Sequence, residues 1–338
     1  MTPYYRPILK RAWKLSLKNK WLWILGFFAA FVGNGSVYEA LVRSFNNMSE
    51  GRSIFFTLRE YAQSGVIGMI SWTKLKILWQ ADASAFGLGI FTLVVVLAIL
   101  ALMISFGIIC QAALIRGFID LDKNKKVEAK KCFRVGIDRF WPVLELNVIT
   151  KVILLGILVM LGYFVSLISL SNPVSQQILY VASFVVFIVL GIIIYFLTIY
   201  GVAYAVLRKR SAFEALRHAW GLFKRNIVLN LEMGLLLFLI NIAVAIGFVI
   251  VSFFALAPAV LLYFIFLMAG AKLGMLLMGL LALIIFLVLL VLVGSWYATF
   301  QLGAWAVLFE ELEENGGKSK IRRIVEHLRK TKRISRSK

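Results

Sequence analysis

The chain has 338 residues, of which 62% are hydrophobic and only 16% are charged, and its formal net charge is +21. This composition excludes an ordinary soluble domain and is typical of a chain that contacts lipid over much of its surface. The positive charge would suggest nucleic acid in a soluble protein, but here it is divided among segments that flank apolar runs, so we expect no nucleic-acid partner.

The first 122 residues are predicted to form the first of three similar units. A basic amphipathic surface helix over residues 5–19 leads into a short apolar span at about 20–36. An external loop over 37–85 precedes a longer returning span at about 86–118. A helix needs about 20 apolar residues to cross a hydrocarbon core of about 30 Å, so the first span is the shortest that we expect.

The second unit, residues 123–210, repeats this order. Its surface helix is predicted over residues 127–141, and its two spans lie at about 143–170 and 176–207. No long loop interrupts this unit, so we expect a simple hairpin of two spans after the surface helix.

The third unit, residues 211–314, has a predicted surface helix over 211–225 and spans at about 227–256 and 273–308. The apolar stretch APAVLLYFIFLMAGA, residues 257–271, is short for a span, and a seventh span would move the C-terminus to the other side of the membrane. We therefore expect it to be an external interfacial or re-entrant segment. The GAKLG sequence at its end suggests close packing or a turn rather than a binding site.

The three surface segments support an internal repeat. A shift of 207 residues lays Ala12 and Trp13 on Ala219 and Trp220, and a shift of 120 lays Trp13 on Phe133. Each segment has apolar residues at i, i+3, i+4 spacing on one face and Lys or Arg on the other. The sequence thus predicts an all-α integral membrane protein with six transmembrane helices, as three repeats of an amphipathic surface helix and a transmembrane hairpin. Chance similarity between basic, aromatic flanks is the alternative.

Lys and Arg gather in segments that six spans would place on one side. The residues before the first span, 116–139, 208–225 and those after 310 contain 30 of the 37 Lys and Arg residues. The positive-inside rule then places both termini in the cytoplasm, with the chain in the plasma (bacterial inner) membrane. Residues 315–338 are predicted to form a basic cytoplasmic tail.

The surface helices have the composition of helices that lie among lipid headgroups. Lys and Arg on one face attract anionic lipid, and Trp or Phe on the other enters the interface. We name nine of the basic residues of these helices the collar. Its candidate contacts with anionic phospholipid are Lys10, Arg11, Lys18, Lys130, Lys131, Arg134, Arg217, Lys224 and Arg225.

Five polar residues lie inside predicted spans and are candidate functional groups: Glu145, Asn147, Lys151, Asn230 and Glu232. The two glutamates occupy the same repeat position, about one helical turn past the interface. Unpaired carboxylates at that depth cost a few kcal/mol. We favour a structural role, in which each glutamate pairs with an arginine of the surface helix before it, over a transport role.

Motifs for catalysis or metal binding are missing. His218 and His327 lack the spacing of metal ligands, and Cys110 and Cys132 suggest no disulfide. The acidic segment 310–314 is interpreted as a solvated helix end that faces the basic tail. We therefore predict no enzyme, no catalytic residue, no cofactor and no metal site.

Two segments carry a resemblance to known proteins. Residues 12–19 and 219–226 each begin with Ala-Trp, end with Asn and lead into paired spans. With these features the chain resembles uncharacterised bacterial multi-pass membrane proteins and is similar to the membrane domain attached to some glycerophosphodiester phosphodiesterases. The phosphodiesterase catalytic domain has no counterpart here, so the resemblance implies a lipid-facing membrane module and no activity.

The sequence leaves two functions open. The first is a non-enzymatic membrane module whose collar binds anionic phospholipid headgroups or an unidentified membrane protein partner. The alternative is a small-solute or lipid transporter or permease that uses Glu145, Lys151 and Glu232.

Overall fold

The protein is all-helical in the part that the structure, a computed structural model, describes. Of the described residues 92% are helical, and none is in a strand. The described residues are 5–32, 83–125, 127–168 and 173–315, together with Lys76, Trp79 and Gln80. The helices are α1 Tyr5–Lys18, α2 Trp21–Ala30, α7 Ala83–Asp122, α8 Ala129–Asp138, α9 Phe140–Ile168, α10 Pro173–Leu207, α11 Ala212–Arg225, α12 Ile227–Met268 and α13 Lys272–Asn315. Most of the predicted external loop, and the basic tail beyond Asn315, lie outside the described residues.

In the part of the chain that the structure describes, five helices are long and apolar enough to cross a membrane. They span Phe86–Asp122, Phe140–Ile157, Val181–Leu207, Ile227–Met268 and Lys272–Glu314. These helices are compatible with an integral membrane protein that crosses the bilayer several times.

The predicted span at residues 20–36 is a shorter helix than expected. Helix α2 has ten residues, so it extends about 15 Å, half of a hydrocarbon core of about 30 Å. Residues 33–36 lie outside the described part, and the sixth predicted span is therefore not confirmed.

Residues 257–268 do not form the separate interfacial segment that we expected. They continue helix α12, which runs unbroken through Pro258 to Met268. A proline removes one backbone hydrogen bond from a helix without ending it where the surrounding chain stays helical. The prediction failed because hydropathy alone gives no boundary inside an uninterrupted apolar run.

The α12–α13 hairpin turns at the GAKLG sequence. Gly270 has a φ of +69°, a left-handed conformation that favours glycine. The amide of Ala271 donates to the carbonyl of Phe266 at 3.0 Å, and that of Gly270 to Leu267 at 3.1 Å, which is the Schellman pattern of a helix end. Gly274 lies so close to the Phe266 ring that a Cβ there would be 2.5 Å from it. This sequence is thus a turn and close-packing element.

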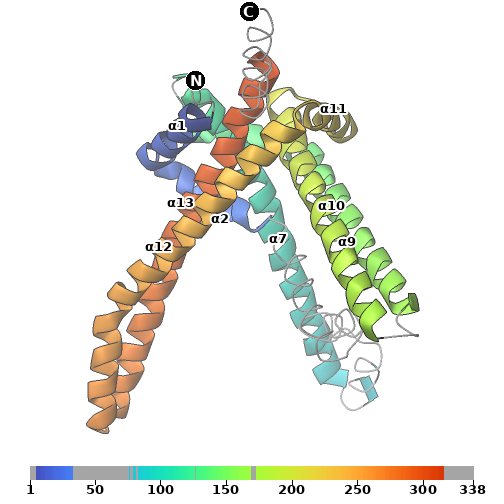
Figure 1. The fold of residues 1–338 in the computed structure, drawn as a ribbon. Coiled ribbons are helices and arrows are strands. Elements are labelled where there is room, and N and C mark those ends of the chain that lie inside the picture. The colour runs from blue at the N-terminus through green and yellow to red at the C-terminus, as the bar shows by residue number, and fades with distance from the viewer. Residues whose placement is uncertain are drawn as a thin grey trace, which may run out of the picture.

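The long helices diverge from one end of the molecule. Figure 1 shows α12 beside α13, α9 beside α10, and α7 as three legs that meet where α1 and α11 lie. We name this end the apex; it consists of α1, α8, α11 and the last turns of α7, α10 and α13. Helix α1, the first described helix, and the C-terminal end of α13, the last, both lie there.

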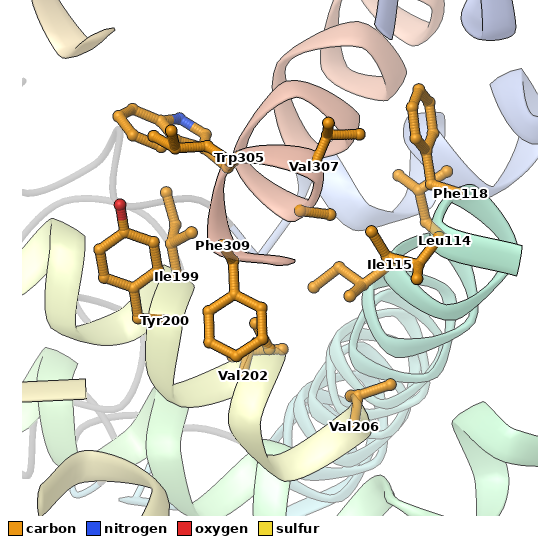
Figure 2. Close-up of a cluster of buried hydrophobic side chains, with 14 of the residues drawn as sticks. Leu114, Ile115, Phe118, Ile199, Tyr200, Val202, Val206, Trp305, Val307 and Phe309 are labelled. Carbon is orange, nitrogen blue, oxygen red and sulfur yellow. The ribbon is translucent and has the colours of Figure 1, made fainter. Parts of the chain in front are cut away.

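The buried core is concentrated at the apex. In Figure 2, side chains from the last turns of α7, α10 and α13 converge, with Trp305 and Tyr200 fully buried. Fully buried alanines stand beside them, two in each helix, which lets the backbones approach closely. These alanines are Ala112, Ala113, Ala203, Ala205, Ala304 and Ala306. Away from the apex the described residues form one small second buried cluster, around Leu154 and Phe187, and Ser252 and Ala259 of α12 are buried outside both clusters.

Each short amphipathic helix packs on the last turns of a different long helix: α8 on α7, α11 on α10, and α1 on α13. Since α1 is the first of these helices along the chain and α13 the last, the contact between them joins the two ends of the described chain. The N-terminal and C-terminal parts of the chain are therefore held together at the apex.

The amphipathic helices bury residues in the same register. The buried residues of α1 are Tyr5, Ile8, Ala12 and Ser16, and those 207 positions later, Ala212, Ala215, Ala219 and Phe223, are buried in α11. In α8, Cys132 and Gly136 are buried, and they lie 120 positions after Ala12 and Ser16. The shifts that align the three sequences thus also align their buried faces.

Gly136 provides a test of the α7–α8 contact. A Cβ at this position would lie 2.4 Å from the carbonyl oxygen of Ile109, a backbone atom that cannot move away alone. We expect Gly136→Ala to lower stability by about 1–3 kcal/mol, measured as thermal unfolding in detergent.

The matched control is Gly156→Ala in α9, where a Cβ would meet nothing within 4 Å. This change should leave stability unchanged or raise it by up to about 1 kcal/mol, because alanine favours helix. Equal unfolding temperatures for the two variants would contradict the close contact.

Candidate functional site

A cavity of about 310 Å³ lies below the apex, where the long helices begin to diverge. Residues of α2, α7, α9, α10 and α13 line it. Its polar lining is uncharged: Gln111, Asn147, Tyr195, Thr198, Tyr297 and Gln301. The volume corresponds to about ten water molecules at about 30 Å³ each.

Two amide hydrogen bonds join helices across this cavity. Asn147 Nδ2 donates to Gln111 Oε1 at 3.2 Å and to the carbonyl of Val143 at 2.8 Å. On the other side Gln301 Nε2 donates to the hydroxyl of Tyr195 at 3.1 Å. Because polar groups inside an apolar bundle are costly unless paired, these bonds fix the helices around the cavity. The cavity offers hydrogen bonds to an uncharged polar group and no charge to an ionic one.

The other four polar residues predicted inside spans lie away from this cavity. Asn230 is buried and accepts a hydrogen bond from the hydroxyl of Tyr200 at 2.5 Å, which ties α12 to α10. Glu232 accepts a hydrogen bond from the hydroxyl of Tyr5, which ties α12 to α1. Glu145 is exposed on α9, and Lys151 is partly exposed one turn and a half further along it.

No contact joins Glu145, Lys151 and Glu232 in the described part of the chain. Nor does the structure record the arginine pairs expected for the glutamates from the surface helices: Arg139 donates instead to the carbonyl of Lys209 at 3.4 Å, and no ion pair links Arg225 to Glu232. Glu232 instead accepts the hydrogen bond from Tyr5, which belongs to another surface helix, α1.

All nine collar residues lie on α1, α8 and α11 at the apex, and all are exposed. Large apolar side chains on the same helices are also exposed, among them Trp13, Ile137, Phe213 and Trp220. Each helix thus buries one apolar stripe against the bundle and keeps cations and an apolar residue outside. Arg11 differs from the other eight, since it forms ion pairs with Asp122 at 3.3 Å and Glu311 at 3.1 Å.

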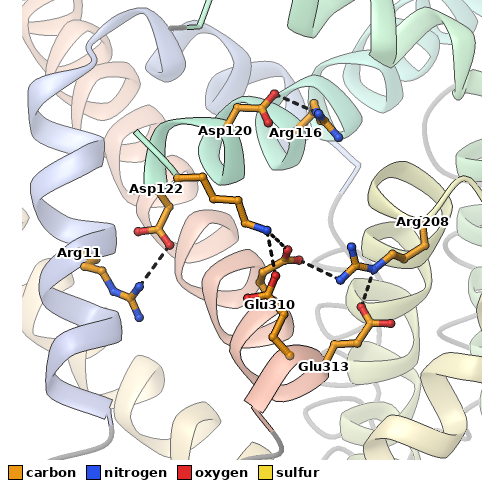
Figure 3. A network of polar contacts seen from close by, with 9 residues as sticks. Arg11, Arg116, Asp120, Asp122, Arg208, Glu310 and Glu313 are labelled. Carbon is orange, nitrogen blue, oxygen red and sulfur yellow. Dashed lines mark hydrogen bonds and ion pairs between the residues drawn. The ribbon is translucent and has the colours of Figure 1, made fainter. Parts of the chain in front are cut away.

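The acidic end of α13 is the centre of an ionic cluster at the apex, which we name the clamp (Figure 3). Three cations from different elements surround it: Arg11 of α1, Lys123 after α7 and Arg208 after α10. Lys123 pairs with Glu310 and, at 3.0 Å, with Glu314; Arg208 pairs with Glu313 at 2.8 Å and lies 3.6 Å from Glu310. The acidic segment is therefore not simply solvated, as the sequence suggested, but joins helices from all three predicted units.

Lys123 of the clamp is charged at physiological pH. Hydrogen bonds from Lys123 to Glu310 and Glu314 raise the pKa of that lysine above its ordinary value of 10.5. A raised pKa in the folded state means that the stabilisation is present below about pH 10.5 and is lost only as the pH rises through the higher value. The contacts of Lys123 are therefore not a switch near neutral pH.

Sequence reasoning missed Gln111, Tyr195 and Gln301 of the cavity, since it considered mainly ionisable residues and neighbouring amides. A signal was available: each is a polar residue within a long apolar run. It was weak, because single polar residues in such runs commonly bond to their own helix, as Thr198 does to the carbonyl of Ile194.

Within the described ranges, no group of three or more His, Cys, Asp or Glu side chains is arranged to hold a metal ion. Cys110 and Cys132 are both free and buried. Comparisons with protein-family models, curated proteins and solved structures gave no match to this chain.

Glu310 provides a test of the clamp. It is buried beside two cations, so Glu310→Gln keeps its shape but leaves Lys123 and Arg208 without their shared carboxylate. We expect a loss of about 1–3 kcal/mol in stability, less than for a fully buried pair because both cations reach solvent. Thermal unfolding in detergent measures this.

Asp138→Asn is the matched control. Asp138 is an exposed carboxylate at the end of α8, and no ion pair is recorded for it among the described residues. Its neutralisation should change stability by no more than about 0.5 kcal/mol. If the two variants unfold at the same temperature, the clamp does not stabilise the apex.

Proposed function

We propose that the protein is a non-enzymatic integral membrane module that binds anionic phospholipid through its collar. Its apex lies at the cytoplasmic face of the bacterial inner membrane, with both termini on that side. One observation carries this proposal: three amphipathic helices lie at the same end of the apolar bundle, and all expose cations.

The physics of interfacial helices supports this placement. Each Lys or Arg near an anionic surface contributes about 1 kcal/mol of attraction. The exposed Trp13 and Trp220, which lie 207 positions apart, have the amphipathic rings that are favoured at headgroup depth. Cations beside exposed aromatic rings suit a headgroup layer better than open solvent.

The repeat belongs to the same proposal. We infer three units, 1–122, 123–210 and 211–314, each with a surface helix and two further helices. The shared register of the buried faces of α1, α8 and α11 supports it, and so does the packing of each surface helix on a different long helix. Three units present three cationic helices to one leaflet, which multiplies a weak attraction.

Lipid is the partner that best suits the long helices. Of the 18 most apolar consecutive residues of α12 only 6% are buried in the described structure, and of those of α13 none is buried. These helices are exposed on most sides away from the apex, as lipid-facing helices are. A membrane protein that covers the α12–α13 hairpin is the alternative partner. The sequence resemblance to the membrane domain of some phosphodiesterases fits the lipid-facing role.

A transporter or permease is the second candidate, and the cavity below the apex favours it. Its lining by amides and hydroxyls would suit an uncharged polar group. Glu145, Lys151 and Glu232 do not line it, so a path of this kind would use Gln111, Asn147 and Gln301 instead.

The lipid-binding proposal predicts that anionic lipid stabilises the folded protein. In nanodiscs, replacing part of the phosphatidylcholine with phosphatidylglycerol should raise the unfolding temperature, because a ligand of the folded state stabilises it. Lys130→Gln, Lys131→Gln and Arg134→Gln together neutralise three collar cations of α8. This triple change should reduce the gain, expressed as free energy of unfolding, by up to about 3 kcal/mol. High salt should reduce it too.

Lys272→Gln is the control, since Lys272 begins α13 at the end of the hairpin far from the apex. It should keep the full gain. An unfolding temperature that does not depend on phosphatidylglycerol in the wild-type protein would contradict the proposed function.

A further inference from the structure

A second cavity, of about 600 Å³, opens at the apex between the end of α10 and the outer face of α11. We name it the basic pocket. Its polar lining is Tyr204, Arg210, Glu214, Arg217, His218 and Arg225. Arg217 and Arg225 belong to the collar, whereas Arg210 is not among its nine residues.

The basic pocket has an excess of positive charge. Three guanidinium groups face one carboxylate, that of Glu214, which lies 3.8 Å from Arg210, beyond hydrogen-bond distance. For Arg217 and Arg225 the structure records no ion pair with any described residue. Guanidinium groups that converge on a cavity without matching carboxylates are typical of an anion site.

The backbone at the end of α10 fixes the pocket's rim. Lys209 has a φ of +55°, so the chain turns sharply after the helix. The amide of Arg210 returns to the carbonyl of Tyr204 at 3.5 Å. On the other wall the His218 ring lies 5.5 Å from the Tyr204 ring. The turn therefore places Arg210 opposite α11.

The contact of α1 with α13 can be compared with the contact of α11 with α10, because the ends of α10 and α13 have similar sequences. AYAVL, residues 203–207 of α10, and AWAVL, residues 304–308 of α13, differ at one position. In this register Arg210 corresponds to Glu311. The shift of 207 makes His218 correspond to Arg11.

Arg11 and Glu311 form an ion pair at 3.1 Å where α1 packs on α13. Where α11 packs on α10, both corresponding positions carry basic side chains, His218 and Arg210, and a cavity separates the helices there. The internal carboxylate that closes one contact is thus replaced by an arginine at the other. An anion from outside the chain can take its place.

We propose that the basic pocket binds the phosphate-ester group of an anionic ligand. This rests on the proposed lipid-binding function and adds a specific site to it. Phosphate oxygens accept paired hydrogen bonds from guanidinium groups, which a diffuse collar of lysines does not provide. Phe213 and Trp220 are exposed on the same helix, and aromatic rings of this kind favour the membrane interface. The same chemistry is found in a soluble phosphate ester.

Calorimetric titration of the full chain in a non-ionic detergent tests the pocket. The probes are dioctanoyl phosphatidylglycerol and glycerol 3-phosphate. Arg217→Gln with Arg225→Gln should weaken binding by about tenfold or more, since two charge-assisted contacts are lost. Lys125→Gln with Lys272→Gln removes the same charge from exposed positions outside the pocket and the collar, and should weaken it by less than about threefold.

Tighter binding of the lipid probe identifies a headgroup ligand, and equal binding of glycerol 3-phosphate identifies a soluble one; both support the pocket. Equal loss in the two double variants would overturn it, since the binding would then depend only on overall charge. So would an absence of binding in the wild-type protein. If phosphatidylglycerol still stabilises that protein in nanodiscs, the pocket alone fails and the lipid-binding function stands.

A third variant tests the replacement itself. Arg210→Glu restores a carboxylate at the position that corresponds to Glu311. We expect probe binding to fall by about tenfold or more while the unfolding temperature is not lowered, because the new carboxylate faces Arg217 and Arg225 across the pocket. Unchanged binding would overturn the proposal.

Discussion

The convergence of α7, α10 and α13 at the apex is the constraint on which the rest of the structure depends. Small residues let these three helices approach, large aromatic rings fill the space between them, and the clamp joins their ends outside the core. Lipid tails are as apolar as leucine, so apolar surface alone does not hold such helices together inside a bilayer. Close packing and charge pairing at one end do so, and this leaves the rest of each helix free to face lipid.

The contact between α1 and α13 follows from the same constraint. Residues 300 positions apart, Arg11 and Glu311, meet because α1 packs on α13. Where the internal ion pair is present, the contact is closed by the chain itself. Where Arg210 stands at the position that corresponds to the carboxylate, the basic pocket opens. The difference between Glu311 and Arg210 thus separates a structural contact from a candidate binding site.

Local pattern predicted much of this fold. The basic amphipathic segments became α1, α8 and α11 within a few residues of their expected bounds, because helical periodicity is strong there. The pattern failed at 257–268, where nothing in an apolar run marks a boundary. The span predicted at about 20–36 is not confirmed, because the helix in its described part, α2, has ten residues. The clamp depends on residues distant in sequence, whose proximity no local spacing reveals. The lining of the basic pocket falls within residues 204–225, and it depends on the turn after α10 that brings Arg210 to face α11.

The most direct measurement of the account is the side of the membrane on which the apex lies. With both native cysteines replaced, single cysteines at Lys10, Lys131, Lys224 and Lys272 can be labelled in cells with a membrane-impermeant maleimide. The first three are exposed on α1, α8 and α11, and the fourth begins α13 at the far end of the hairpin. The account predicts labelling from outside at position 272 alone; labelling from outside at any of the three apex positions would contradict it.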